Sequence, residues 1–233
     1  MTEKQNRILK LVMVGILLFS MFVVAREGAV YVSGVQVENR KEICIVIDAG
    51  HGGADPGKVG VNDQLEKDIN LLVAQKLKQF LQAEGIRVVM TREGDAGLYE
   101  ESASNKKVQD MKKRLEIIEA ADPLLVVSIH QNSYHEEYVN GAQVFYYTTS
   151  EKSKLLAETL QEQLRSLDPD NKREAKGNDS YFLLKKTSKP IVIVECGFLS
   201  NREEAAKLSS QVYQEQLAWN IHMGIMKYLS GHP

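Results

Sequence analysis

The sequence is poor in cysteine, in net charge and in repeated segments. Among its 233 residues there are two cysteines, Cys44 and Cys196, which excludes a small fold held together by several disulfides. Both lie in β-branched runs, so we expect buried side chains, and the sequence leaves one bridge between them open. Lysine and arginine number 29 against 31 acidic residues, and this balance gives no electrostatic reason to expect a nucleic-acid partner. No repeat or low-complexity tract is found.

The N-terminus differs from the rest of the chain. Three basic residues among the first ten precede an apolar stretch, residues 11–25. Its length of about 15 residues lies between the core of a signal peptide and the roughly 20 residues that cross a bilayer. We therefore predict a signal peptide or an N-terminal membrane anchor over residues 1–25, with the following chain exported. Residues 26–40 are expected to form a linker or an edge strand before one domain, residues 41–233.

Strand-like and helix-like segments alternate beyond residue 40. Apolar runs predict strands at 42–48, 86–90, 124–129, 142–147 and 190–194, and periodic stretches predict helices at 65–84, 104–121, 151–167 and within 203–229. The turn-rich segment 168–180 is expected to be a loop. This alternation predicts an α/β fold with a central, mostly parallel twisted sheet flanked by helices on both faces.

Polar side chains stand where several of the predicted strands end. They are Asp48, His51, Thr91, Arg92, His130, Gln131, Asn132 and Glu195. Active sites of open α/β sheets lie outside the carboxyl ends of the strands. We therefore expect two imidazoles and a carboxylate from distant segments to meet at one edge of the sheet.

His51 lies among the glycines at positions 50, 52, 53 and 57. Glycines remove side chains that would crowd the ring and permit backbone angles that other residues avoid, so we expect room for a metal ion and a bulky substrate. One alternative is a tight turn in which the histidine is incidental. Another is a phosphate-binding loop, which requires G-x-G-x-x-G opening directly into a helix. The third glycine is missing and Pro56 intervenes, which disfavours that alternative.

Glu66 stands at the start of a predicted helix and has two readings. Asp63 and Glu66 have the spacing of a capping box, and an acid in the first turn suits the helix dipole. The same carboxylate is in range of His51 and His130. Two imidazoles and one carboxylate leave a fourth position open on a tetrahedral zinc ion, which is the arrangement of a catalytic site.

Glu195 ends a strongly apolar strand. A carboxylate there costs several kcal/mol unless it is paired, hydrated or near a metal. It is either paired with a strand-end cation such as Arg92, or it acts as general base and acid beside metal-activated water.

The remaining polar candidates are weaker. Asp48 is either a turn residue or a partner for an imidazole N–H. Arg92 and Arg114 form either structural ion pairs, which we favour, or contacts with substrate carboxylates. The other histidines have no convergent neighbours and are interpreted as bystanders; they are His135, His222 and His232.

The motifs together resemble the zinc-dependent N-acetylmuramoyl-L-alanine amidases. The resemblance rests on IDAGHGGADPG, the helix start at Glu66, MTR, VVSIHQNS and IVIVECGFLSN, in that order. It covers roughly residues 42–230, and the stretch GAQVFYY is most similar to the CwlD-type amidases of spore-forming bacteria. Members commonly read SIHAN where this chain reads SIHQN, so Gln131 replaces a small residue beside the expected metal.

The resemblance implies one zinc ion held by His51, Glu66 and His130, with Glu195 as the catalytic carboxylate. It implies cleavage of the amide between the lactyl group of N-acetylmuramic acid and L-alanine of the peptidoglycan stem, and a place in forming muramic-δ-lactam in the spore cortex. We expect peptidoglycan as the substrate, and targeting or activation by a partner protein or by the N-terminal segment.

Two other functions remain open at this point. A zinc carboxypeptidase acting on stem peptides would use the same four residues, with Arg92 or Arg114 in a pocket for the terminal carboxylate. A non-catalytic wall-binding protein would retain only a degenerate site, which the presence of all four residues disfavours.

Overall fold

The computed structural model describes residues 2–37 and 42–231 and divides into two units between Glu42 and Ile43. The first unit holds one helix, α1 (Glu3–Val37). Its segment Glu3–Glu27 is long and apolar enough to cross a membrane, and none of its apolar window is buried. Residues 26–37, where a linker or an edge strand is expected, continue this helix; the rest of that segment lies outside the described residues.

A six-stranded sheet with the order β2-β1-β3-β6-β4-β5 forms the centre of the second unit. Neighbours among β2, β1, β3 and β6 are parallel, β4 is antiparallel to β6, and β5 is parallel to β4. The strands are β1 (Cys44–Ala49), β2 (Arg87–Met90), β3 (Leu125–Asn132), β4 (Gln143–Tyr147), β5 (Lys176–Asn178) and β6 (Ile191–Phe198). The mostly parallel α/β sheet predicted from the alternation is thereby confirmed.

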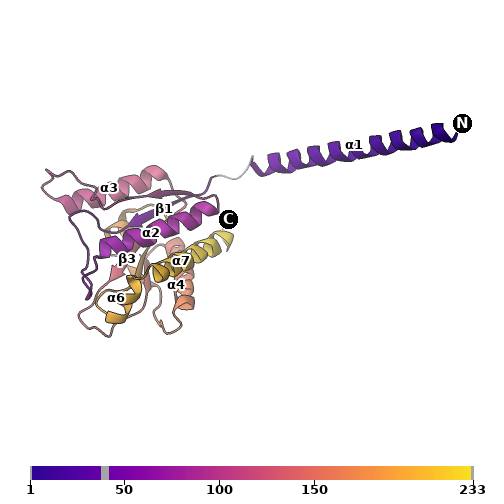
Figure 1. Ribbon diagram of the computed structural model, residues 1–233. Helices are drawn as coiled ribbons and strands as arrows, with labels where there is room; N and C mark the ends of the chain where they lie inside the picture. Colours follow the sequence, from indigo (N-terminus) through magenta and orange to yellow (C-terminus); the bar gives the residue numbers. More distant parts are fainter. Residues whose placement is uncertain (1, 38–41, 232–233) are drawn as a thin grey trace. The chain divides into compact units, whose positions relative to one another are not determined.

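Helices cover both faces of this sheet. One face packs against α2 (Glu66–Ala83), α4 (Glu151–Leu167), α6 (Arg202–Leu208) and α7 (Gln211–Gly231). The other packs against α3 (Lys106–Ala121) and α5 (Phe182–Lys186). Figure 1 shows α2 and α7 side by side. Valine and isoleucine dominate β1, β3 and β6 because these strands are buried on both faces.

Two short elements have no counterpart among the predicted ones. β5 lies within the segment expected to be a loop, and α5 follows it. The sequence of β5, Lys-Gly-Asn, has neither alternation nor β-branched residues, so its pairing with β4 is decided by tertiary contacts and not by local preference.

The connections place the site at the middle of the sheet. β1 is flanked by β2 on one side and β3 on the other, and the helices that follow β1 and β2 cover opposite faces. The crevice outside the carboxyl ends of β1 and β3 is therefore a topological switch point, where open α/β sheets bind ligands.

Register then decides which residues face this crevice. His130 of β3 is paired with Glu195 of β6, and the register shifts immediately beyond them. Two residues before each of them along the strand, Ser128 and Ile193 are also paired, and Ile193 packs in the core on the α3 and α5 face. Because side chains alternate along a strand, His130 and Glu195 project from that same face.

Candidate functional site

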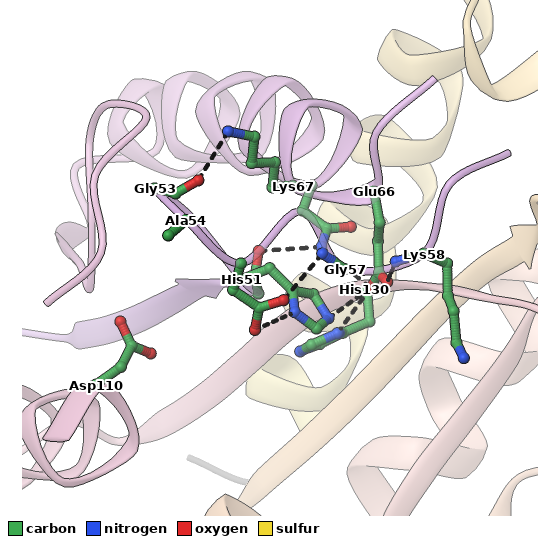
Figure 2. Close-up of polar contacts among 12 residues, drawn as sticks. His51, Gly53, Ala54, Gly57, Lys58, Glu66, Lys67, Asp110 and His130 are labelled. Atoms are coloured by element: carbon green, nitrogen blue, oxygen red, sulfur yellow. Dashed lines mark hydrogen bonds and ion pairs between the residues drawn. The ribbon is translucent and has the colours of Figure 1, made fainter. Parts of the chain in front are cut away.

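Three of the predicted residues meet at the carboxyl edge of the sheet. His51 comes from the loop after β1, Glu66 is the first residue of α2, and His130 lies in β3. One ligand atom from each lies within 4.8 Å of the others. Glu66 Oε1 is 3.2 Å from His51 Nε2 and 3.0 Å from His130 Nδ1, and Figure 2 shows the three side chains converging. We call this group the His51–Glu66–His130 trio; its donors suit a divalent metal such as zinc.

Glu66 is held by backbone as well as by imidazole. The N–H of Lys58 donates to its Oε2 at 2.8 Å, and the N–H of Gln131 donates to its Oε1 at 3.1 Å. Burial raises the pKa of this carboxyl, but the hydrogen bonds and charges of the two imidazoles outweigh burial and hold the pKa far below its usual range. The site therefore presents Glu66 as an ionised carboxylate, as a metal ligand must be.

The capping-box reading of Glu66 is wrong. Leu65 is the N-cap residue of α2, and no side chain caps the helix. Asp63 has φ 62° and stands outside the helix. α2 begins at Glu66, with Leu65 as the N-cap residue. The Glu66 carboxylate therefore does not cap the helix, and it contacts His51 and His130 instead.

His51 is fixed in an unusual backbone conformation. Its φ of 61° lies in the left-handed region, which costs energy for a residue with a side chain. Its Nδ1 is 2.9 Å from Asp55 Oδ2, which leaves Nε2 facing Glu66. Burial lowers the pKa of His51, but Glu66 and Asp55 outweigh it and raise the pKa.

Asp55 is a functional residue that the sequence reasoning missed. It occupies the same glycine-rich loop, four residues after His51, and pairs with the ring nitrogen that faces away from Glu66. An acid at that spacing in a loop that carries an expected ligand is a usable signal, because metal-binding imidazoles nearly always have such a partner.

Arg92 and Arg114 donate hydrogen bonds to backbone carbonyls of the segment that leads into and carries His51. Arg114 donates from Nη2 to the carbonyl of His51 at 2.6 Å and from Nη1 to that of Ala49 at 2.7 Å. Arg92 donates to the carbonyls of Ala49 and Gly50 at 2.9 and 3.0 Å. Both side chains are buried, and neither is free to bind a substrate carboxylate. Arg114 forms the expected structural ion pairs, with Asp48 and Asp110, whereas Arg92 is held by backbone carbonyls.

Asp48 supports the site indirectly. It accepts hydrogen bonds from Arg114, Thr91 and Ser128 at 2.7, 2.7 and 2.5 Å. Burial raises the pKa of this carboxyl, but Arg114 and Ser128 outweigh it and lower the pKa to about 2. Neither alternative for Asp48 is found: it lies within β1 and not in a turn, and its hydrogen bonds come from Arg114, Thr91 and Ser128 and not from an imidazole. Asp48 acts on the His51 loop through Arg114.

The glycines of the loop are needed for a different reason from the one expected. At Gly50 an added Cβ would lie 2.2 Å from the ring of His130, and at Gly52 and Gly53 it would lie 2.6 Å from the backbone of residues 96–97. Protein atoms occupy these positions, so the glycines permit close packing around His51 and do not hold space open for a substrate.

Glu195 lines the same cleft as the trio and has one carboxylate oxygen without a hydrogen-bond partner among the described residues. Its Oε2 is buried and has no hydrogen-bond partner among the described residues, which rules out the alternative of an ion pair with Arg92. Burial raises the pKa of this carboxyl to about 7, with Glu66 adding to the effect and the imidazoles of His130 and His51 opposing it. A carboxyl with that pKa can accept and return a proton near neutral pH.

A cleft of about 790 Å³ gives access to the trio and to Glu195. Its far wall is partly apolar and includes Met111, Tyr181 and Leu183. Burial and the nearby Glu195 raise the pKa of Tyr181 to about 12, so its hydroxyl remains a proton donor at neutral pH. Sequence reasoning missed this residue because it lies in a segment without a recognisable pattern.

The remaining candidates are separate from the trio. Cys44 and Cys196 are both buried and are not joined by a disulfide, so the bridge that the sequence left open is not formed. His135 is exposed and lies 3.8 Å from Glu136. His222 is buried, with its ring beside those of Phe80 and Trp219. His232 lies outside the described residues.

Comparison with known proteins agrees with this geometry. Residues 45–227 match the family model described as N-acetylmuramoyl-L-alanine amidase. The germination-specific N-acetylmuramoyl-L-alanine amidase of Bacillus subtilis is 37% identical over 189 residues, which are 80% of this chain and 79% of that protein. The amidase LytC of the same organism is 33% identical over 79% of this chain, but the match spans only 35% of LytC.

Solved structures show the same relationship. The CwlD amidase from Clostridioides difficile, whose structure is a complex with the GerS lipoprotein, superposes with a TM-score of 0.80 at 41% identity, covering 82% of this chain and all of that chain. The catalytic domain of CwlV from Bacillus (Paenibacillus) polymyxa superposes with a TM-score of 0.72 at 30% identity, covering 81% and 98%. The chain is therefore an enzyme of the N-acetylmuramoyl-L-alanine amidase family.

Proposed function

We propose that this amidase uses one zinc ion, held by the His51–Glu66–His130 trio, with Glu195 as its catalytic carboxylate. The bond cleaved is the amide between the lactyl group of N-acetylmuramic acid and L-alanine of the peptidoglycan stem. One observation carries the proposal: Glu195, which is paired in register with His130, has a buried oxygen without a hydrogen-bond partner among the residues that the structure describes.

The donor set fits a zinc ion. Two imidazole nitrogens and one carboxylate oxygen make three of four tetrahedral ligands and leave one position open. Asp55 on the far nitrogen of His51 supplies the support that such ligands require. When bound, zinc supplies Lewis-acid chemistry, polarising a carbonyl oxygen and making water a better nucleophile at neutral pH.

The protein's own groups perform the proton transfers. Glu195 takes the proton from the attacking water on its unpartnered oxygen and returns it to the alanine nitrogen as the amide bond breaks. Burial at the end of an apolar strand raises the pKa of this carboxyl above its usual range, which favours a group that can both accept and return a proton. Tyr181 lines the same cleft, where its hydroxyl would donate to substrate oxygens.

The carboxypeptidase alternative lacks its expected pocket. Arg92 and Arg114, which were to bind the terminal carboxylate, are committed to backbone carbonyls. A wall-binding protein with a degenerate site is equally unsupported, because Glu195 would then be a buried carboxylate that brings only a cost.

We also propose the surroundings in which this chemistry occurs. Residues 1–25 act as a signal peptide or membrane anchor, residues 26–40 link it to the zinc amidase domain (41–233), and that domain works outside the cytoplasmic membrane on peptidoglycan. The apolar segment of α1 supports this arrangement. The complex of the CwlD amidase with a lipoprotein supports a protein partner for this chain, and the germination-specific relative supports a role in the spore cortex, in forming muramic-δ-lactam.

Mass spectrometry of digested peptidoglycan tests the proposal. Full-length protein in detergent, supplied with zinc, is incubated with purified peptidoglycan. We expect glycan strands without stems, together with intact stem peptides that carry a free N-terminal alanine. Shortened stems that remain attached to glycan would identify a carboxypeptidase instead. Zinc-loaded, folded protein that binds the polymer and cleaves nothing would identify a wall-binding protein.

A further inference from the structure

Gln131 directly follows the trio residue His130, yet its side chain lies on the other face of the sheet. Alternation along β3 directs His130 toward α3 and α5, and Gln131 toward α2. Gln131 is only 3% exposed. A buried amide in that position requires an explanation, because burying a polar group without bonds is unfavourable.

The nitrogen of the Gln131 amide is paired with Asn70 of α2, whereas its Oε1 is buried and has no hydrogen-bond partner among the described residues. Gln131 Nε2 donates to Asn70 Oδ1 at 3.1 Å. Asn70 is fully buried and stands one helical turn after Glu66. Its own amide nitrogen donates to Glu66 Oε1 at 3.3 Å and to the carbonyl of Gly50 at 3.1 Å.

These contacts fix which way the Asn70 amide points. An amide carries two donors on nitrogen and accepts only on oxygen. Gln131 donates to the oxygen and the nitrogen faces two acceptors, Glu66 and Gly50, so all three contacts favour the same orientation of the amide. Without that donor the Asn70 oxygen loses the one hydrogen bond that it accepts in a buried position, and the amide that holds Glu66 is less firmly fixed.

We propose that Gln131 is a positioning residue for Glu66, acting through the Asn70 amide, and that this relay strengthens metal binding by the trio. The proposal rests on the proposed metal site. The relay also reaches the His51 loop, since Asn70 bonds the carbonyl of Gly50. Supporting partners of metal ligands typically change metal affinity by about 10- to 100-fold when they are removed.

The test measures zinc affinity in the absence of substrate. Full-length protein in detergent competes with a chromophoric chelator for zinc, and thermal unfolding of the metal-free protein is followed in parallel. Gln131→Met removes the donor while keeping the volume, and we expect it to weaken zinc binding about 10-fold. Asn70→Ala should weaken it at least as much, and the double variant should be no weaker than Asn70→Ala alone, because both act on one contact.

Gln161→Ala is the matched control. Gln161 is an equally buried glutamine that bonds the backbone of Val144 and Ala142, away from the trio. It should lower the unfolding temperature and leave zinc affinity unchanged. A Gln131→Met protein with zinc affinity within about twofold of wild type, or additive losses in the double variant, overturns the relay. Wild-type protein that takes up no zinc overturns both the relay and the proposed metal site. Gln131→Ala provides a second variant should the methionine fail to fold.

Discussion

The site residues at the ends of β1 and β6 differ in how many hydrogen bonds surround them. The loop after β1 is held from several sides: Arg92 and Arg114 donate to its carbonyls, and Lys67 Nζ donates to Gly53 O at 3.0 Å. At β6, Glu195 has a buried oxygen with no partner among the described residues. Several hydrogen bonds hold the loop after β1, whereas the end of β6 carries a glutamate oxygen that has none among the described residues.

The two carboxyls of the cleft show the same contrast. Hydrogen bonds hold the pKa of Glu66 far below its usual range, whereas burial raises the pKa of Glu195 to about 7. A ligand must stay ionised and fixed, while a proton carrier needs a free oxygen and a pKa near the working pH. The distribution of polar partners thus separates the two roles before any metal or substrate binds.

Removal of the Glu195 carboxylate, at the end of β6, should have the largest effect on activity. We expect Glu195→Gln to lower kcat about 10³-fold, because general acid–base catalysis contributes roughly 10² to 10⁴. Zinc content should be unchanged, and the free energy of unfolding should not fall, since Oε2 of this carboxylate has no hydrogen-bond partner in the part of the chain that the structure describes. Glu203→Gln, at an exposed acid of α6, is the control. Near wild-type turnover by Glu195→Gln would remove Glu195 from the mechanism.

In the loop after β1, removal of the Arg114 guanidinium should mainly lower the stability of the fold. Arg114→Met leaves Asp48 buried and without its cation, which we expect to lower the free energy of unfolding by about 3–5 kcal/mol. Urea unfolding at neutral pH measures this. The neighbouring exposed pair of Lys113 and Glu116 offers a control, because Lys113→Met should change stability by less than about 1 kcal/mol. Equal effects of the two substitutions would contradict the supporting role of Arg114.

A steric test of the close packing around His51 should have an intermediate effect. Gly50→Ala places a methyl group against the ring of His130, and overpacking of this kind costs about 1–3 kcal/mol. It should also weaken zinc binding, because the ring must move. Gly94→Ala, where an added Cβ meets nothing within 4 Å, should change neither property. A harmless Gly50→Ala would mean that the space beside His130 is freely adjustable.

The smallest effect on stability is expected when the pH is lowered until the Asp48 carboxylate becomes protonated. The pKa of Asp48 is lowered to about 2 in the folded protein, against about 3.9 when unfolded. The unfolded state therefore binds more protons between pH 4 and 2, and the stability that Asp48 provides above pH 4 is lost as pH falls through this window.

Comparison with Asp48→Asn isolates this contribution. The difference in free energy of unfolding between wild type and variant should shrink by about 2 kcal/mol across the window. Urea titrations from pH 5 down to the lowest pH at which both proteins remain folded would follow it. A difference that stays constant with pH would mean that Asp48 is not stabilised as a carboxylate.

Much of the site could be predicted because the end of a buried strand can be recognised in the sequence. His51, His130 and Glu195 each follow a run of β-branched residues, and parallel strands bring their ends together. Glu66 was ambiguous because a capping acid and a ligand occupy the same first turn. Only the entry of the chain at Leu65 decides between them.

Long-range side-chain contacts could not be predicted in the same way. Arg114 bonds a carbonyl 63 residues away, and Gln131 bonds a helix 61 residues earlier in the chain. Neither carries a local pattern, since a buried arginine and a surface arginine look alike in sequence. The role of the glycines was misjudged for the same reason, because the atoms they face belong to His130 and to another loop.

The pairing of His130 with Glu195 also constrains how this chain can change in length. Side chains on a strand switch faces at every residue. One residue inserted into β6 before Glu195 would turn the carboxylate to the α2 face and put the inserted residue or Val194 in its place. A two-residue insertion would restore the face but shift the carboxylate by roughly 7 Å along the strand. The short interval from Ile191 to Glu195 is therefore as much a part of the catalytic apparatus as the glutamate itself, and deletions there are as damaging as substitutions.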